Sequence, residues 1–187
     1  MRRMLRSKPK KTVDDYMALP FEGYGIELIR GEFVVSPSSP GSPHQRFLWK
    51  LVSAFDSYNR RARVGEFMFC PMDVILADDV VVQPDILMIS NERAHILRDR
   101  VRGAPDLAVE VISPGTSDRD RFVKRDLYER HGVREYWIVD LDARTIEVLS
   151  LGGDGAFGAA TVYQETDRID STPLLAGLAL ELKGLWP

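Results

Sequence analysis

Two acidic residues stand where their neighbours would ordinarily exclude a charge. Glu110 interrupts the apolar run 107–112, and Asp85 directly follows a proline within the run 80–89. A carboxylate buried in such a strand loses its hydration at a cost of several kcal/mol, unless a cation or hydrogen-bond donors replace the water. If the two strands lie side by side, both carboxylates can hold one hard divalent ion, most simply Mg²⁺, with water completing the octahedron.

A third candidate, Lys124, lies in the basic segment that follows. Arginine outnumbers lysine 19 to 6 in the chain, and among the six basic residues from 119 to 134 only residue 124 is lysine. Its compact charge and readily shifted pKa suit lysine to position or deprotonate a water near a metal. At four-residue spacing Asp120, Lys124 and Tyr128 share one stripe of a predicted helix, so Lys124 and Tyr128 should point together at the sheet.

The same residues also fit a purely structural interpretation. In that interpretation Glu110 and Lys124 form a buried ion pair, Asp85 caps a turn, and none of the three takes part in chemistry. The residue pattern alone favours neither interpretation.

Hydrophobic spacing and turn signals predict the elements that must position these residues. They are helices at 12–20, 42–61, 91–98 and 116–131, a hairpin at 25–35 around Arg30-Gly31, a second hairpin with arms 72–77 and 80–89, strands at 106–112, 135–139 and 145–149, and one or two strands after 158. Because a helix joins the strands at 106–112 and 135–139, these two should run parallel. We therefore predict one α/β domain over residues 12–187, with a mixed central β-sheet flanked by helices and an N-terminal β-hairpin.

The composition excludes several classes of protein. The 187 residues are 44% apolar and 28% charged, as expected for one globular domain. One cysteine rules out an internal disulfide, and no apolar run approaches the roughly 18 residues that span a bilayer. The absence of a secretory signal makes the cytoplasm the default location. Serine hydrolases, dinucleotide enzymes, P-loop proteins and zinc proteases are disfavoured, because the sequence lacks their motifs.

Charge is distributed unevenly along the chain. The net charge is −3, yet residues 1–11 carry six positive charges and no acidic side chain, which leaves −9 for the remainder. An acidic body argues against a broad basic surface for nucleic acid, so any DNA contact should be local. We interpret residues 1–11 as a flexible, solvated tail. Exposed edges of a small sheet are often covered by a partner subunit, so the sequence allows a homodimer without fixing the stoichiometry.

The order of these motifs resembles the PD-(D/E)XK nuclease superfamily and, more closely, the Uma-two family of restriction-endonuclease-like proteins. The matching segments follow one another in unbroken order and cover most of 24–150; they are 24–32, 42–46, 71–74, 81–85, 103–116, 120–128 and 132–140. The resemblance implies that the mixed central β-sheet and its helices form a restriction-endonuclease-like fold. It also implies hydrolysis of DNA phosphodiester bonds with Mg²⁺, for which Mn²⁺ can substitute.

Residue by residue, the resemblance implies that Asp85 is the metal-binding aspartate, Glu110 the second acidic ligand, and the backbone carbonyl of Val111 a third. The superfamily's lysine would fall at position 112, where this chain has Ile112. Lys124 on the following helix is therefore expected to take its place.

Other residues are implied to line the site. The spacing of Lys124 and Tyr128 is similar to a motif of RecB-type nucleases, in which glutamine takes the place of Lys124. His44 resembles the active-site histidine of those nucleases, with a simple helix-end hydrogen bond as the alternative. Glu27, on the opposite face of its strand from its apolar neighbours, is a weaker candidate for the metal site.

The leading hypothesis is a magnesium-dependent endonuclease in which Asp85 and Glu110 hold the metal and Lys124 orients the attacking water. Arg121 and Arg125 are predicted to neutralise flanking phosphates, with an ordinary solvated surface as the alternative. A second hypothesis is a nuclease-like module that binds or regulates without cutting, which the missing lysine and the acidic body favour. Phosphoryl transfer to a small molecule is less favoured, because the sequence has no nucleotide-binding motif.

Overall fold

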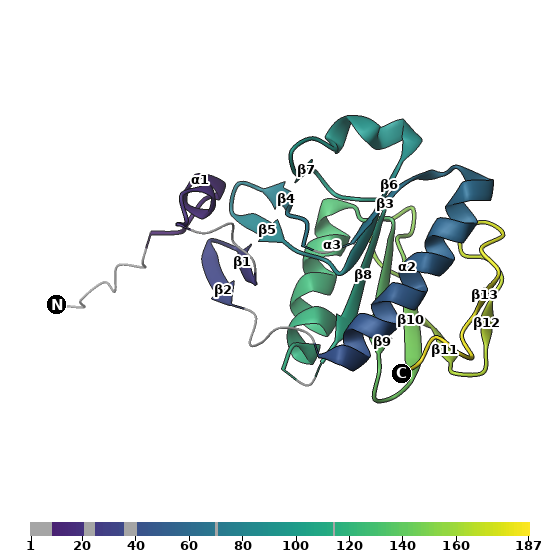
Figure 1. The fold of residues 1–187 in the computed structure, drawn as a ribbon. Helices are drawn as coiled ribbons and strands as arrows, with labels where there is room; N and C mark the ends of the chain where they lie inside the picture. Colours follow the sequence, from purple (N-terminus) through teal and green to yellow (C-terminus); the bar gives the residue numbers. More distant parts are fainter. Residues whose placement is uncertain (1–8, 21–24, 36–40, 70, 114) are drawn as a thin grey trace.

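Two large β-sheets, a short two-stranded sheet and the surrounding helices form the structure, a computed structural model that describes residues 9–20, 25–35, 41–69, 71–113 and 115–187 (Figure 1). The larger sheet has the strand order β11 (Thr161–Gln164), β10 (Thr145–Ser150), β9 (Glu135–Asp140), β8 (Leu107–Ile112), β6 (Ile86–Ser90) and β3 (Gly65–Phe69). The smaller sheet has the order β2 (Glu32–Val35), β1 (Ile26–Ile29), β5 (Val80–Val82), β4 (Val74–Ala77) and β7 (Val101–Arg102). The other elements are α1 (Val13–Met17), α2 (Ser42–Ala62), the 3₁₀-helix η1 (Asn91–Ile96), the π-helix η2 (Arg119–Lys124), α3 (Arg125–His131) and the paired strands β12 (Arg168–Ile169) and β13 (Leu180–Glu181).

The predicted α/β architecture is confirmed, including its local signals. Strands β8 and β9 are parallel and are joined by the η2–α3 crossover. The β1–β2 turn has positive φ at both Arg30 (53°) and Gly31 (83°), the backbone that a two-residue hairpin turn of the primed type requires. Helix α3 ends at Gly132, which is left-handed with φ 81°.

Two sequence predictions need correction. The arm predicted as one strand over 80–89 is two strands, β5 and β6, which belong to different sheets and are separated by the segment 83–85. Pro84 explains the break, because proline cannot donate to a sheet ladder. Strand β3 was not predicted at all. It pairs with β6 so closely that a Cβ on Gly65 would lie 2.0 Å from the carbonyl oxygen of Ile89.

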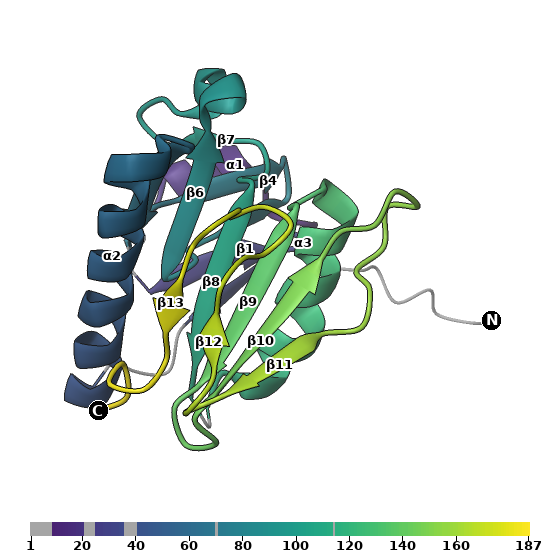
Figure 2. The same ribbon diagram turned by 90° about the vertical axis from the view of Figure 1, so that its right-hand side faces the viewer.

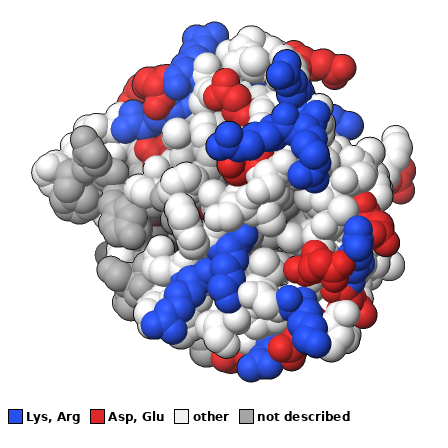
Figure 3. Space-filling model, turned by 45° about the vertical axis from the view of Figure 1, so that its right-hand side comes forward, with Lys and Arg blue, Asp and Glu red and all other residues white. Residues whose placement is uncertain are grey.

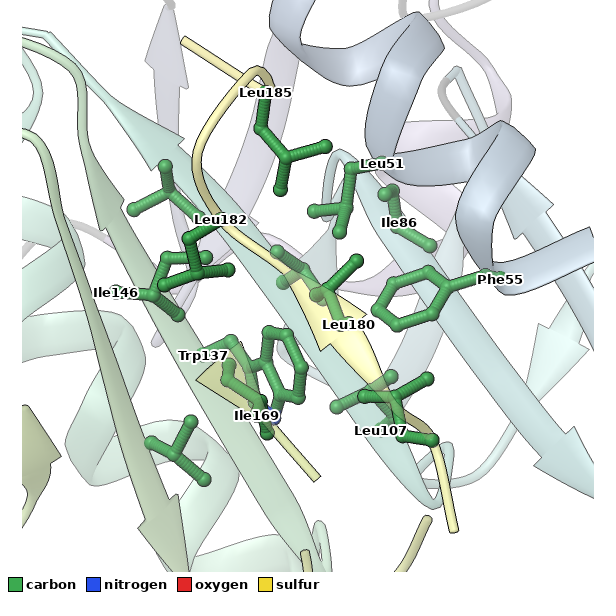
Figure 4. Close-up of a cluster of buried hydrophobic side chains, with 14 of the residues drawn as sticks. Leu51, Phe55, Ile86, Leu107, Trp137, Ile146, Ile169, Leu180, Leu182 and Leu185 are labelled. Carbon is green, nitrogen blue, oxygen red and sulfur yellow. The ribbon is translucent and has the colours of Figure 1, made fainter. Parts of the chain in front are cut away.

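The larger sheet is covered on both faces. Helix α2 and the C-terminal segment that carries β12 and β13 cover one face (Figure 2). Their apolar side chains interdigitate with those of the sheet around Trp137, as Figure 4 shows. Helix α3 covers the opposite face, and a second cluster joins it to the smaller sheet. Since Val109 and Val111 belong to the first cluster and Ala108 and Ile112 to the second, strand alternation turns Glu110 towards α3.

The remaining sequence features lie at the periphery. Residues 1–8 of the predicted basic tail fall outside the described residues, whereas Lys10 pairs with Asp79 at 3.0 Å and Lys11 with Asp15 at 3.2 Å. None of the described helices combines the length and apolarity needed to cross a bilayer.

A buried carboxylate, Asp106, ties together the chain segments that precede β8 and β9. It accepts hydrogen bonds from the backbone N–H of Ser90 at 2.8 Å and from Arg93 and Arg134 at 3.3 Å each. Burial alone would raise the pKa of Asp106, but the Ser90 amide and the two guanidinium groups outweigh it and lower the pKa below its ordinary value.

We expect Asp106→Asn to lower the free energy of unfolding by about 1–3 kcal/mol at pH 7, because it removes the charge that the two arginines neutralise. A lowered folded-state pKa contributes stability above the unfolded value of about 3.9 and loses it as the pH falls below that value. The difference between the wild type and the variant should therefore shrink below about pH 4 in urea unfolding curves. A constant difference from pH 7 to pH 3 would contradict this role.

Candidate active site

The ammonium group of Lys124 lies among buried carboxylates from three separate elements. It is 2.7 Å from Oε1 of Glu110 on β8, 2.9 Å from Oε1 of Glu27 on β1, and 3.8 Å from Oδ1 of Asp120 on η2. All four side chains are at most 6% exposed. A single cation thus joins the larger sheet, the smaller sheet and the crossover helix.

The crossover helix presents Lys124 and Tyr128 to the sheet as the four-residue spacing predicts. The Tyr128 hydroxyl donates to the same Oε1 of Glu110 at 2.8 Å. The first turns are π-helical, since the backbone N–H of Arg125 bonds the carbonyl of Asp120. That carbonyl also accepts from the buried hydroxyl of Tyr136 at 3.1 Å. Single π-helical turns are frequent at functional sites.

Asp85 lies beside Glu110 at the point where β6 begins. Ile86 pairs with Val109 at the end of the antiparallel ladder, and Asp85 and Glu110 are the adjoining residues on the same side of that pair. The Asp85 carboxylate accepts the backbone N–H of Val111 at 2.7 Å. The two acidic residues that were predicted to converge are therefore neighbours across two adjacent strands.

His44, in the first turn of α2, contacts this aspartate. Its Nε2 is 3.3 Å from Oδ2 of Asp85. The other ring nitrogen, Nδ1, is buried and has no hydrogen-bond partner among the described residues. The predicted association of His44 with the site is thus present as a contact with Asp85.

Burial and the neighbouring charges shift the pKa values of Glu110 and Lys124. Burial raises the pKa of Glu110 well above its usual range; the Lys124 ammonium opposes this, and Asp120, Asp85 and Glu27 add to the rise. For Lys124, burial would lower the pKa, but Glu110, Glu27 and Asp120 raise it well above its usual range. These neighbours favour the charged form of Lys124, which donates hydrogen bonds to the carboxylates around it.

Acidic side chains outnumber basic ones in this site. Four acids lie close to two basic side chains; the acids are Glu27, Asp85, Glu110 and Asp120, and the bases are Lys124 and Arg119. Buried Oε2 of Glu27 and Oδ1 of Asp120 have no hydrogen-bond partner in the described part of the chain. Such oxygens are costly unless something compensates them.

A divalent cation fits this donor set. Within the described ranges, no three His, Cys, Asp or Glu side chains already form a metal cage. Mg²⁺, however, is usually held by one or two carboxylates and several waters rather than by an all-protein cage. The hydrogen bonds from Lys124 and Tyr128 to Glu110 both use Oε1. The residues that would hold the ion are Asp85 and Glu110, with the Val111 carbonyl implied only by the family resemblance.

The two arginines that were predicted to contact phosphate differ in their surroundings. Arg121 forms ion pairs with Asp140, at 3.2 Å, and with Glu147. These acids neutralise its charge. Arg125 begins α3 and is partly exposed.

Sequence reasoning gave no site role to three residues that the structure brings here. Asp120 was recognised only as part of a helical stripe, although its four-residue spacing from Lys124 was a usable signal. Arg119 lies 3.9 Å from Glu27. The backbone N–H of Gln83 donates to Oε1 of Glu27 at 2.9 Å. Neither of the last two has a sequence signal, because both depend on how the smaller sheet is placed.

Comparison with known proteins agrees with the fold and the family. A solved structure described as a "putative nuclease belonging to DUF820 from Anabaena variabilis ATCC 29413" is similar, with a TM-score of 0.76 and 22% identity over 93% of this chain and 96% of that chain. At this identity the likeness shows a shared fold. No curated protein matches the chain. The family model described as "Putative restriction endonuclease" matches residues 13–183, so this chain belongs to the Uma2 (Uma-two) family.

Proposed function

We propose that this protein is a Mg²⁺-dependent endonuclease that hydrolyses DNA phosphodiester bonds at the site around Asp85 and Glu110. The observation that carries the proposal is geometric: Asp85 and Glu110 lie in neighbouring segments of the larger sheet, and Glu110, Glu27 and Asp120 surround the ammonium group of Lys124. One divalent cation would compensate this surplus of acidic side chains. Carboxylate oxygens are also the ligands that a hard cation prefers.

Each side chain of the site has its own role in the proposed reaction. Asp85 and Glu110 hold the ion, and Tyr128 fixes the orientation of Glu110 through its 2.8 Å hydrogen bond. When bound, the metal supplies an acidified water and withdraws charge from a phosphate oxygen. Lys124 has three N–H donors, two of which point at Glu110 and Glu27 at hydrogen-bond distance. The third donor is the group proposed to orient the water or the phosphate.

Contact with DNA is proposed to be local. On the face seen in Figure 3, basic side chains form separate groups with acidic side chains among them. Because Arg121 is already neutralised by two acids, Arg125 is the better candidate for a phosphate contact on this helix. A small number of phosphate contacts gives a shallow dependence of binding on salt, with a slope of about 0.9 per contact for duplex DNA.

A nuclease-like module that does not cut is the competing function. The observation in its favour is that the ion pairs of Lys124 with Glu110 and Glu27 are those expected of a structural site without a metal. In addition, Ile112 stands at the position of the superfamily's lysine and packs in the apolar cluster beneath α3. The two functions differ in whether a divalent ion binds and supports cleavage.

Plasmid cleavage separates these two functions. We expect the wild type to nick or linearise plasmid DNA in about 5–10 mM Mg²⁺ or Mn²⁺, concentrations above the dissociation constant expected for such a site. Asp85→Asn and Glu110→Gln, which keep the shape of each side chain, should slow cleavage by about 100-fold or more. Glu92→Gln, at an exposed position, serves as the matched control. Cleavage by both site variants at the wild-type rate would reject the assigned site.

Lys124→Met tests the charge balance directly. Removing the ammonium takes away the cation that competes with a metal ion for Glu110, so Mn²⁺ should bind about tenfold more tightly or better in calorimetric titration. Turnover should nevertheless fall, because the donor that orients the water is lost. Lys183→Met, which removes an exposed lysine, is the control. Weaker Mn²⁺ binding together with unchanged turnover would show that Lys124 has neither role.

A further inference from the structure

Gln83 lies at the junction between the two sheets. It follows β5 of the smaller sheet and directly precedes Pro84-Asp85, after which β6 of the larger sheet begins. Its backbone N–H donates a hydrogen bond to Oε1 of Glu27 at 2.9 Å. The same oxygen forms the ion pair with the Lys124 ammonium, also at 2.9 Å. The backbone of Gln83 therefore contacts the carboxylate of Glu27, and Gln83 precedes Asp85 by two residues in the sequence.

The side chain of Gln83 is anchored at both ends of its amide. The amide nitrogen donates to Asp73 at 2.8 Å and to the hydroxyl of Tyr16 at 3.2 Å, and the amide oxygen accepts from the backbone of Gly25 at 3.3 Å. Asp73 is itself held by Arg100 at 2.7 Å. A planar amide with its donors and acceptor engaged has a fixed orientation.

These hydrogen bonds link three separate segments in and beside the smaller sheet. Tyr16 belongs to α1, Gly25 directly precedes β1, and Asp73 directly precedes β4. The Tyr16 hydroxyl also reaches Asp73 at 2.9 Å and is buried. Displacing the amide of Gln83 would therefore release the connection before Asp85 from α1 and from both strands together.

We propose that Gln83 is a positioning residue, which fixes Glu27 relative to Lys124 through its backbone N–H, while its side-chain amide holds that backbone in place. This inference rests on the proposed function and adds a residue that acts on it through Glu27. Partners that orient metal-binding side chains typically alter metal affinity or activity by about 10- to 100-fold when they are changed.

A double-mutant cycle between Gln83→Met and Glu27→Gln tests the proposal in the full chain. Gln83→Met keeps the length of the side chain and removes its hydrogen bonds. We expect it to weaken Mn²⁺ binding and lower kcat by about tenfold, with KM for plasmid changing less. In the Glu27→Gln background Gln83→Met should alter Mn²⁺ affinity and kcat by less than about twofold. The carboxylate through which Gln83 acts on the site is already absent in that background.

The controls distinguish positioning from general destabilisation. Gln164→Met, at an exposed edge position, should leave Mn²⁺ affinity and kcat unchanged. If Gln83→Met does not fold, Tyr16→Phe takes its place in the cycle, because it removes only one hydroxyl from the same network. Equal effects of the variant in both backgrounds would overturn the positioning role. Wild-type protein that neither binds Mn²⁺ nor cleaves DNA would instead remove the proposed function, and the inference with it.

Discussion

The architecture of the site depends on one buried ammonium ion held between carboxylates that belong to separate elements. Lys124 reaches Glu110 on the larger sheet, Glu27 on the smaller sheet and Asp120 on its own helix. Breaking such an arrangement by removing one partner leaves an uncompensated buried charge, which is far costlier than the loss of a surface ion pair. The two sheets and the crossover helix are therefore held to one arrangement by charge as well as by apolar packing.

The same arrangement connects stability with activity. Four acidic side chains surround fewer basic ones, and two buried carboxylate oxygens have no hydrogen-bond donor among the described residues. Native proteins tolerate such local costs mainly where function requires them. The surplus of acidic side chains supports the proposed cation-binding site, although the purely structural interpretation shares the bond between Glu110 and Lys124.

Much of this was predictable from local sequence signals. Glu110 within an apolar strand, the stripe of Asp120, Lys124 and Tyr128, and the positive-φ turn at Arg30-Gly31 each follow from a period of two or four residues or from turn chemistry. What could not be predicted was the division of 80–89 between two sheets. A strand pattern does not indicate which sheet a strand joins. The contacts of Gln83 and Arg119 and the full burial of Glu27 therefore could not be predicted from the sequence.

The most direct test is crystallographic. Crystals of the wild-type protein soaked in Mn²⁺ should show a single anomalous peak per chain between the carboxylates of Asp85 and Glu110, with Lys124 still on the same side of the sheet and within reach of a metal-bound water. Density showing Asp85 and Glu110 without any ion at saturating Mn²⁺, and Lys124 still paired with Glu110 and Glu27, would contradict the account and leave a structural ion pair.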